Sequence, residues 1–232
     1  MKNNNNKQNK PVKFAVLATD VLLFSFYDNE LLVKLIKINR PPYFKNIWGF
    51  PGGLVKPKET AEGAVARIVF EKAGLAKKSL IHLEQLYTFS DIDRDPRGRV
   101  VSVAYFGCLS WPDLQKIEKT NNSELKWSSI KKIDKLAYDH NQMLKVGLER
   151  LKSKVAYSTI ISKLIAREFT LTDLETTMEI ILERKIDKRN FRKKILKLNV
   201  IQETGDKKIG FKSRPAKLYR FISHKVINIE LI

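Results

Sequence analysis

The order of strand-like and helix-like segments constrains this chain most. Before about Arg150, apolar runs typical of strands alternate with two helical segments; after it, short amphipathic helical segments follow one another. Strands interleaved with helices predict a mixed α/β domain, and the later helices predict a second, mainly helical domain. A chain of 232 residues has room for both. We expect a disordered tail over residues 1–11, a first domain over 12–152 and a second over 153–232.

In the first domain, two apolar runs flank the turn-forming pair Asp28-Asn29 and predict a β-hairpin. The proline- and glycine-rich segment 40–53 predicts a loop, and Gly74 predicts a helix end. Asp139 is expected to cap a closing helix. The expected elements are strands over Val12 to Tyr27, Leu31 to Ile38, Leu80 to Phe89 and Arg99 to Leu109, and helices over Thr60 to Ala73 and Tyr138 to Leu151.

The charge of the chain is strongly basic. Its 44 Lys and Arg residues against 25 Asp and Glu give a net charge of +19, and Arg184 to Arg220 holds 14 basic and three acidic residues. Such an excess predicts a polyanionic partner, either nucleic acid or an acidic membrane surface. No apolar run is long enough for a membrane span, and the N-terminus has no signal-peptide core. The single Cys108 excludes an internal disulfide and disfavours zinc, so a reducing cytoplasm is expected.

A spaced pattern over residues 53–75 carries the first resemblance. The pattern is G-x5-E-x7-R-E-U-x-E-E-x-G-U, where U is a bulky apolar residue. The residues that match it at the right spacing are Gly53, Glu59, Arg67, Val69, Glu71, Gly74 and Leu75. The segment is similar to the signature of the Nudix hydrolases. That resemblance implies a mixed sheet between helices, an α/β/α sandwich.

The same segment departs from the pattern where hydrolytic members hold divalent metals. Three glutamates are expected on one helix face, and this chain has Ile68, Glu71 and Lys72 there. Isoleucine cannot coordinate a metal and lysine repels one, so we expect no catalytic residues, no metal and no cofactor. Glu71 is expected to pair with Arg67, and Lys72 either contacts a bound diphosphate or is simply solvated.

The segment YTFSDIDRDPRGRVVSVAYF resembles ADP-ribose-handling Nudix proteins and the transcription regulators related to them. Its Arg94, Arg97 and Arg99 offer planar donors to phosphate or ribose, although the neighbouring aspartates are equally good partners. Trp48 and Phe50 are candidates for stacking on a base, with core packing as the alternative. The expected ligand-binding residues are Arg94, Arg97, Arg99, Trp48, Phe50, Gly53 and Lys72.

The second domain has the pattern of a winged helix-turn-helix. A short helix over Ser158 to Ala166 is followed by a helix with a capping box at Thr172 and Glu175, and by a basic helix capped by Asp187. Strands at Val200 to Gln202 and Lys217 to Phe221 would pair around a turn at Gly205-Asp206 to form the wing. The expected DNA-binding residues are Lys188, Arg189, Asn190, Arg192, Lys193, Lys212, Arg214 and Lys217.

From about residue 12 to 221 the domain order, with FTLTDLETTMEIILERKIDKRNFRKKI and the wing SRPAKLYRF, resembles the NrtR-like Nudix-related transcriptional regulators. The resemblance implies a homodimeric repressor of NAD-salvage or sugar-use genes. Such a repressor binds a palindromic double-stranded operator and responds to an effector, ADP-ribose in the best-known branch and arabinose in a sister branch. An ADP-ribose pyrophosphatase with an appended nucleic-acid domain and an RNA-binding module remain the alternatives.

Overall fold

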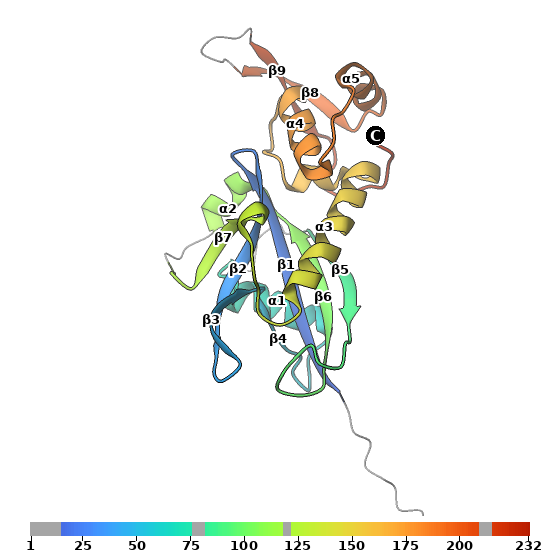
Figure 1. Ribbon diagram of the computed structural model, residues 1–232. Coiled ribbons are helices and arrows are strands. Elements are labelled where there is room, and N and C mark those ends of the chain that lie inside the picture. The colour runs from blue at the N-terminus through green and yellow to red at the C-terminus, as the bar shows by residue number, and fades with distance from the viewer. Residues whose placement is uncertain (1–14, 76–81, 118–121, 209–214) are drawn as a thin grey trace, which may run out of the picture.

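The computed structural model describes residues 15–75, 82–117, 122–208 and 215–232; the expected tail over residues 1–11 lies outside them. A seven-stranded mixed sheet is followed by a helical domain with a two-stranded wing (Figure 1). The strands of the sheet are β1 (Val16–Tyr27), β2 (Glu30–Arg40), β3 (Phe44–Gly49), β4 (Gly52–Leu54), β5 (His82–Phe89), β6 (Val100–Cys108) and β7 (Leu125–Ser129). Its helices are α1 (Ala61–Glu71), α2 (Trp111–Ile117), the 3₁₀ helix η1 (Ile130–Lys132) and α3 (His140–Tyr157).

The predicted hairpin forms the centre of the sheet. β1 and β2 pair antiparallel with Tyr27 opposite Glu30, and both turn residues, Asp28 and Asn29, have positive φ angles of 49° and 58°. That geometry is a type I′ turn, whose twist matches that of the strands. β1 also pairs in parallel with β6, and the main strand order is β3-β2-β1-β6-β5.

Helices cover both faces of the sheet, which confirms the predicted sandwich. Alternate residues of β1 point to opposite faces, because the side-chain period of a strand is two. Leu22 and Phe24 pack with α3, whereas Val21 and Leu23 pack with α1. All four side chains are fully buried.

The prediction of a plain loop over residues 40–53 was wrong. The segment forms β3 and β4, which pair with β2 and β1 respectively. β4 approaches β1 so closely that a Cβ on Gly52 would lie 1.8 Å from Asp20 Oδ1. Non-local pairing, rather than local propensity, therefore makes these short strands. α2 and β7 were not predicted either.

The second domain has the predicted winged-helix architecture. Its elements are the 3₁₀ helix η2 (Thr159–Lys163), α4 (Leu171–Leu182), α5 (Lys188–Lys197), β8 (Ile201–Lys208) and β9 (Ala216–Phe221). The short helix expected from Ser158 is present as the 3₁₀ helix η2. Two local predictions were wrong: Gly205 lies within β8 with φ +90°, and the capping box is Thr170 with Asp173. Thr170, rather than Thr172, is the N-cap because it immediately precedes the first helical residue, so its hydroxyl accepts the Asp173 amide.

α3 belongs to both parts of the molecule. In Figure 1 it runs from the sheet to the winged helix, and the expected boundary between residues 152 and 153 falls inside it. One hydrophobic cluster extends from Leu22 and Phe24 through Leu151 and Val155 to Leu174 of α4. No described helix is long and apolar enough to cross a membrane.

Candidate functional site

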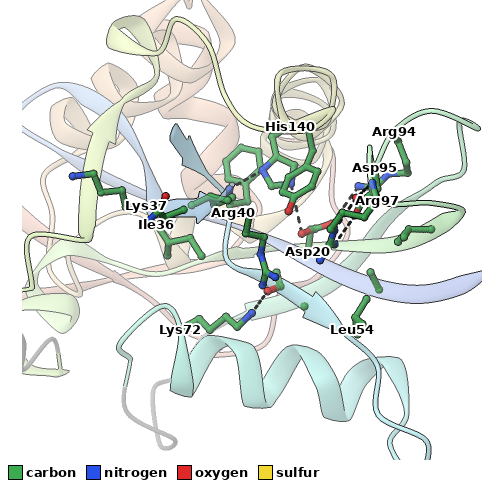
Figure 2. Close-up of a pocket in the computed structure, with 18 residues that line it drawn as sticks. Asp20, Ile36, Lys37, Arg40, Leu54, Lys72, Arg94, Asp95, Arg97 and His140 are labelled. Atoms are coloured by element: carbon green, nitrogen blue, oxygen red, sulfur yellow. Dashed lines mark hydrogen bonds and ion pairs between the residues drawn. The ribbon is translucent and has the colours of Figure 1, made fainter. Parts of the chain in front are cut away.

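A cavity of about 540 Å³ opens at the end of the sheet where α3 begins (Figure 2). Side chains from β1, β2, β4, α1, the loop after β5 and the start of α3 surround it. The lining residues are Ala18, Asp20, Ile36, Lys37, Ile38, Asn39, Arg40, Phe50, Gly52, Gly53, Leu54, Lys72, Arg94, Asp95, Arg97, Val100, Tyr138 and His140.

Most of the expected ligand-binding residues meet in this cavity, but two do not line it. The residues that do are Arg94, Arg97, Phe50, Gly53 and Lys72. Trp48 instead packs under the ammonium of Lys126, 4.2 Å from its ring centre. Arg99 donates to the carbonyls of Ser90 and Asp91 at 2.7 and 3.0 Å, which holds the shape of the loop.

Arg94 is buried within a network of carboxylates. Its guanidinium donates twice to Asp139 at 2.8 Å, and its Nη2 lies 3.4 Å from Asp20 Oδ2. Burial would raise the pKa of Asp20, but His140, Ser102 and Arg94 together hold that pKa below its ordinary value. Asp139 stands at the start of α3 as predicted, yet its side chain makes no capping bond because it is engaged by Arg94.

His140 joins α3 to the floor of the cavity. Its Nδ1 accepts the Phe50 backbone N–H at 2.9 Å, so in the neutral ring the proton is on Nε2. Nε2 faces Asp20 Oδ1 at 3.6 Å. Phe50 and His140 also stack, with ring centres 5.2 Å apart. Phe50 is therefore a core residue that contributes part of one wall.

Arg97 is fixed by its own loop and by an aromatic ring. It forms a two-point ion pair with Asp95 at 2.9 and 2.6 Å, and its guanidinium lies 5.8 Å from the centre of the Tyr138 ring. The hydrogen bond to Asp95 raises the pKa of Arg97 above its ordinary value. Of the alternatives left open for these arginines, pairing within the loop holds for Arg97 with Asp95, whereas Arg94 bonds to carboxylates 45 and 74 residues away.

α1 and the residue after it carry the three positions at which the resemblance implies metal-binding glutamates. Ile68 is fully buried against the sheet, and Glu71 pairs with Arg67 at 3.6 Å as predicted. Lys72 reaches from the end of α1 to donate to the Gly52 carbonyl. Among the described residues no group of three or more His, Cys, Asp or Glu side chains could hold a metal ion.

Cations outnumber anions around the cavity. Sequence reasoning missed Lys37 and Arg40, which lie on β2 and belong to no motif. Arg40 projects into the cavity toward Lys72, whereas the Lys37 side chain points away from it (Figure 2). Figure 2 shows Lys72 pointing from α1 toward Arg40. Burial lowers the pKa of Lys72, and the Arg40 and Arg67 guanidiniums lower it further. Because Asp20 and Asp95 already pair with arginines, the surplus positive charge is available to an anionic ligand.

The basic face of the second domain lies on α5. Asp187 caps the helix by accepting the Asn190 amide, and Phe191 and Ile195 are buried, as predicted. The Asn190 side chain also donates to Asp187 at 2.8 Å. Lys188, Arg189 and Lys193 are exposed, so their charges are available to a large partner.

Two further expected DNA-binding residues, besides Asn190, have partners within the domain. Arg192 donates to both carboxylate oxygens of Glu175 on α4, at 2.6 and 3.0 Å. Lys217 on β9 pairs with Glu203 on β8 at 2.9 Å. Lys212 and Arg214 lie outside the described residues. Arg192 therefore also joins the two helices of the helix-turn-helix.

Residues 161–221 match the NrtR DNA-binding winged helix domain, and residues 16–147 match the NUDIX domain. A relative in Acinetobacter baylyi, described as an ADPR responsive transcriptional repressor, is 33% identical over 89% of this chain and 82% of its own. The chain belongs to the NrtR family of Nudix-related transcriptional regulators.

Solved structures of NrtR proteins share the fold of the whole chain. Shewanella oneidensis NrtR in complex with a 27mer DNA is 31% identical, with a TM-score of 0.78, over 88% of this chain and 93% of that one. The NUDIX domain of the same protein in complex with ADP ribose is 32% identical, with a TM-score of 0.52, over 63% and 94%. These matches confirm the predicted fold class and the predicted family.

Proposed function

We propose that this protein is a cytoplasmic transcriptional repressor that binds double-stranded DNA through its winged helix and responds to ADP-ribose bound in the cavity. The observation that carries the proposal is the pairing, in one chain, of a cation-lined Nudix cavity with an exposed basic α5. The A. baylyi relative, described as ADPR responsive, and the two S. oneidensis complexes support both halves.

The diphosphate of ADP-ribose would be held by side chains in place of metal ions. Lys72 and Arg40 offer charged donors from two sides of the cavity, and Arg97 adds a planar guanidinium. Gly53 keeps the space beside Lys72 free, because a Cβ there would lie 3.1 Å from Nζ. Arabinose has no charge for these cations to neutralise, so the cavity favours a nucleotide over a sugar.

We propose no hydrolase activity for this site. Ile68 has no oxygen to offer a metal, and the ammonium of Lys72 occupies the position where a second carboxylate would be needed. The one remaining carboxylate, Glu71, is paired with Arg67. The role of the cavity is then to bind the nucleotide and release it unchanged.

DNA recognition would use a homodimer on a palindromic site. The two copies of α5 would enter successive major grooves, about 34 Å apart or a multiple of it. We propose that Arg189 and Lys193 reach base edges or phosphates and that the wing contacts the backbone. The proposed DNA-binding set is Lys188, Arg189, Asn190, Arg192, Lys193, Lys212, Arg214 and Lys217.

Fluorescence anisotropy with a duplex selected from a random pool tests the proposal. We expect tight binding to the selected duplex, weak binding to a scrambled one, and a change in affinity with ADP-ribose but not with arabinose. Arg189→Ala should weaken specific binding by about 1–3 kcal/mol, whereas Lys145→Ala, which removes an exposed charge on α3, should have little effect. Equal affinity for both duplexes, or tighter binding to the matching RNA, would refute the regulator assignment.

A further inference from the structure

We infer that α3 transmits the state of the cavity to α5, and that the Arg94–Asp139 ion pair is the contact through which a bound ligand acts on α3. This inference rests on the function proposed above, and adds to it the residues that couple the two sites. Coupling requires an element whose position depends on both sites, and α3 has contacts at both ends that meet this requirement.

The first turn of α3 forms part of the cavity. Tyr138 and His140 line it, and Asp139 between them is clamped by Arg94 through two hydrogen bonds of 2.8 Å. The Arg94 side chain is only 3% exposed, and it is also in contact with Asp20 on β1. The clamp therefore fixes the start of α3 to the sheet at the cavity wall.

An anionic ligand would compete for this clamp. Arg94 lines the cavity, and its donors are divided between Asp139 and Asp20. A phosphate oxygen approaching Arg94 is a charged acceptor of the same kind as the Asp139 carboxylate. Because Asp139 makes no capping bond to its own helix, loss of Arg94 would leave it without the partner that anchors the helix. Ligand binding would thus loosen the start of α3 from the sheet.

The last turns of α3 hold the winged helix. Lys152 pairs with Glu183 at the end of α4, at 2.6 Å. The backbone carbonyls of Ala156 and Tyr157 accept the amides of Leu231 and Ile229 at 2.9 and 2.8 Å. Movement of α3 would therefore carry both α4 and the C-terminal segment with it.

The C-terminal segment connects α3 to α5. Leu231 is 1% exposed and lies in the same hydrophobic cluster as Phe191 and Ile195, the buried residues of α5. Glu230, its neighbour, lies 3.9 Å from Lys194 of α5. A continuous series of packed contacts thus leads from Asp139 to the helix that we propose enters DNA.

α3 is suited to transmit a displacement over this distance. Its 18 residues span about 27 Å, and it contains no proline that would bend it. Gly147 at its centre lies against β1 so closely that a Cβ would be 2.6 Å from Leu22. Met143, Leu144 and Leu151 are buried along the same side, so the helix packs over most of its length. A straight helix packed in this way would carry a displacement of its first turn to its last as a unit.

Breaking the clamp by mutation tests the inference. Asp139→Asn keeps the size of the side chain but removes the charge that holds Arg94. Arg94→Lys, a second variant, keeps the charge but loses the two-point geometry. Glu149→Gln is the matched control, because it makes the same carboxylate-to-amide change at an exposed position of α3. For each, operator affinity is measured by anisotropy with and without saturating ADP-ribose, and thermal unfolding confirms the fold.

We expect ADP-ribose to change the operator affinity of the wild type and Glu149→Gln by about 5–150-fold. Asp139→Asn without ADP-ribose should show the affinity of ligand-saturated wild type, and ADP-ribose should change it by less than about twofold. Arg94→Lys should fall between the two. A full wild-type response in folded Asp139→Asn would overturn the coupling role of the clamp. No response in the wild type itself would instead refute the proposed function.

Discussion

Removal of Arg192 tests how the recognition helix is held. The Arg192 guanidinium bonds Glu175 at 2.6 and 3.0 Å, and the side chains are 44% and 2% exposed respectively. Arg192 also donates to Thr172 at 3.2 Å, so two side chains of α4 hold it. Arg192→Ala would leave the Glu175 carboxylate buried without its charged partner.

The expected loss follows from the burial of Glu175. Removing one member of a buried ion pair costs about 3–5 kcal/mol, because the other charge remains desolvated. Water reaches this pair through the half-exposed Arg192, so we expect about 2 kcal/mol. At this chain length that loss corresponds to a fall in melting temperature of about 4–8 °C. Glu175→Gln retains a neutral acceptor and should cost about 1 kcal/mol.

Thermal and urea unfolding of Arg192→Ala, Glu175→Gln and the double variant give the interaction energy of the pair. Lys185→Ala is the control, because Lys185 also forms an ion pair within the helix-turn-helix, with Glu179, but its side chain is 92% exposed. That exposed pair should contribute under about 0.5 kcal/mol to the free energy of unfolding. If the pair positions α5, Glu175→Gln will also weaken operator binding although it removes no positive charge. An interaction energy near zero, together with unchanged operator binding in Glu175→Gln, would show that Arg192 does not position the helix.

Three further outcomes are expected. ADP-ribose incubated with the protein and magnesium or manganese should remain intact by chromatography. Turnover above about 1 per second would contradict the proposal that Ile68 and Lys72 prevent metal binding. The double variant Ile68→Glu with Lys72→Glu restores the two carboxylates and is the one in which hydrolysis should be looked for. Lys72→Ala and Arg40→Ala should each weaken ADP-ribose binding about tenfold by calorimetry and leave the binding of adenosine, which has no phosphate, unchanged. The contribution of Glu59 and Asp20 to the free energy of unfolding should be constant above about pH 4.5 and decline as the pH falls toward 2, because Arg67 lowers the pKa of Glu59 from 4.5 to about 2 and the pKa of Asp20 is also depressed. Each of these carboxylates stabilises the fold only while it is ionised, so Asp20→Asn should flatten this decline.

Features with local causes could be predicted from the sequence. Asp28-Asn29 specifies its hairpin because both residues tolerate positive φ, and Asp187 caps α5 because the next amides need an acceptor. The spacing from Gly53 to Leu75 placed α1 correctly, with Gly74 at φ +70° after it. Each of these features depends on residues within a few positions of one another.

Features that depend on residues far apart in the chain could not be predicted from the sequence. Arg94 has three aspartates within a few residues, yet its carboxylate partners come from β1 and α3, which the fold brings together. Glu175 fits a capping box with Thr172 by spacing alone, but it is taken by Arg192 on the next helix. Nothing in the sequence marks Lys37 and Arg40 as cavity residues, since exposed charged residues are common in strands.

Ile68 and Lys72, at positions where the Nudix signature has glutamates, would explain how the cavity that we propose favours sensing over turnover. A metal does two things beside a diphosphate: it neutralises charge and it activates water. An ammonium at Lys72 supplies only the first, because it binds no water as a metal does and cannot lower the pKa of a nucleophile by coordination. A sensor needs its ligand to dissociate unchanged, so that occupancy follows concentration. If the cavity acts as we propose, the lysine would keep the affinity for the diphosphate without supplying the reaction.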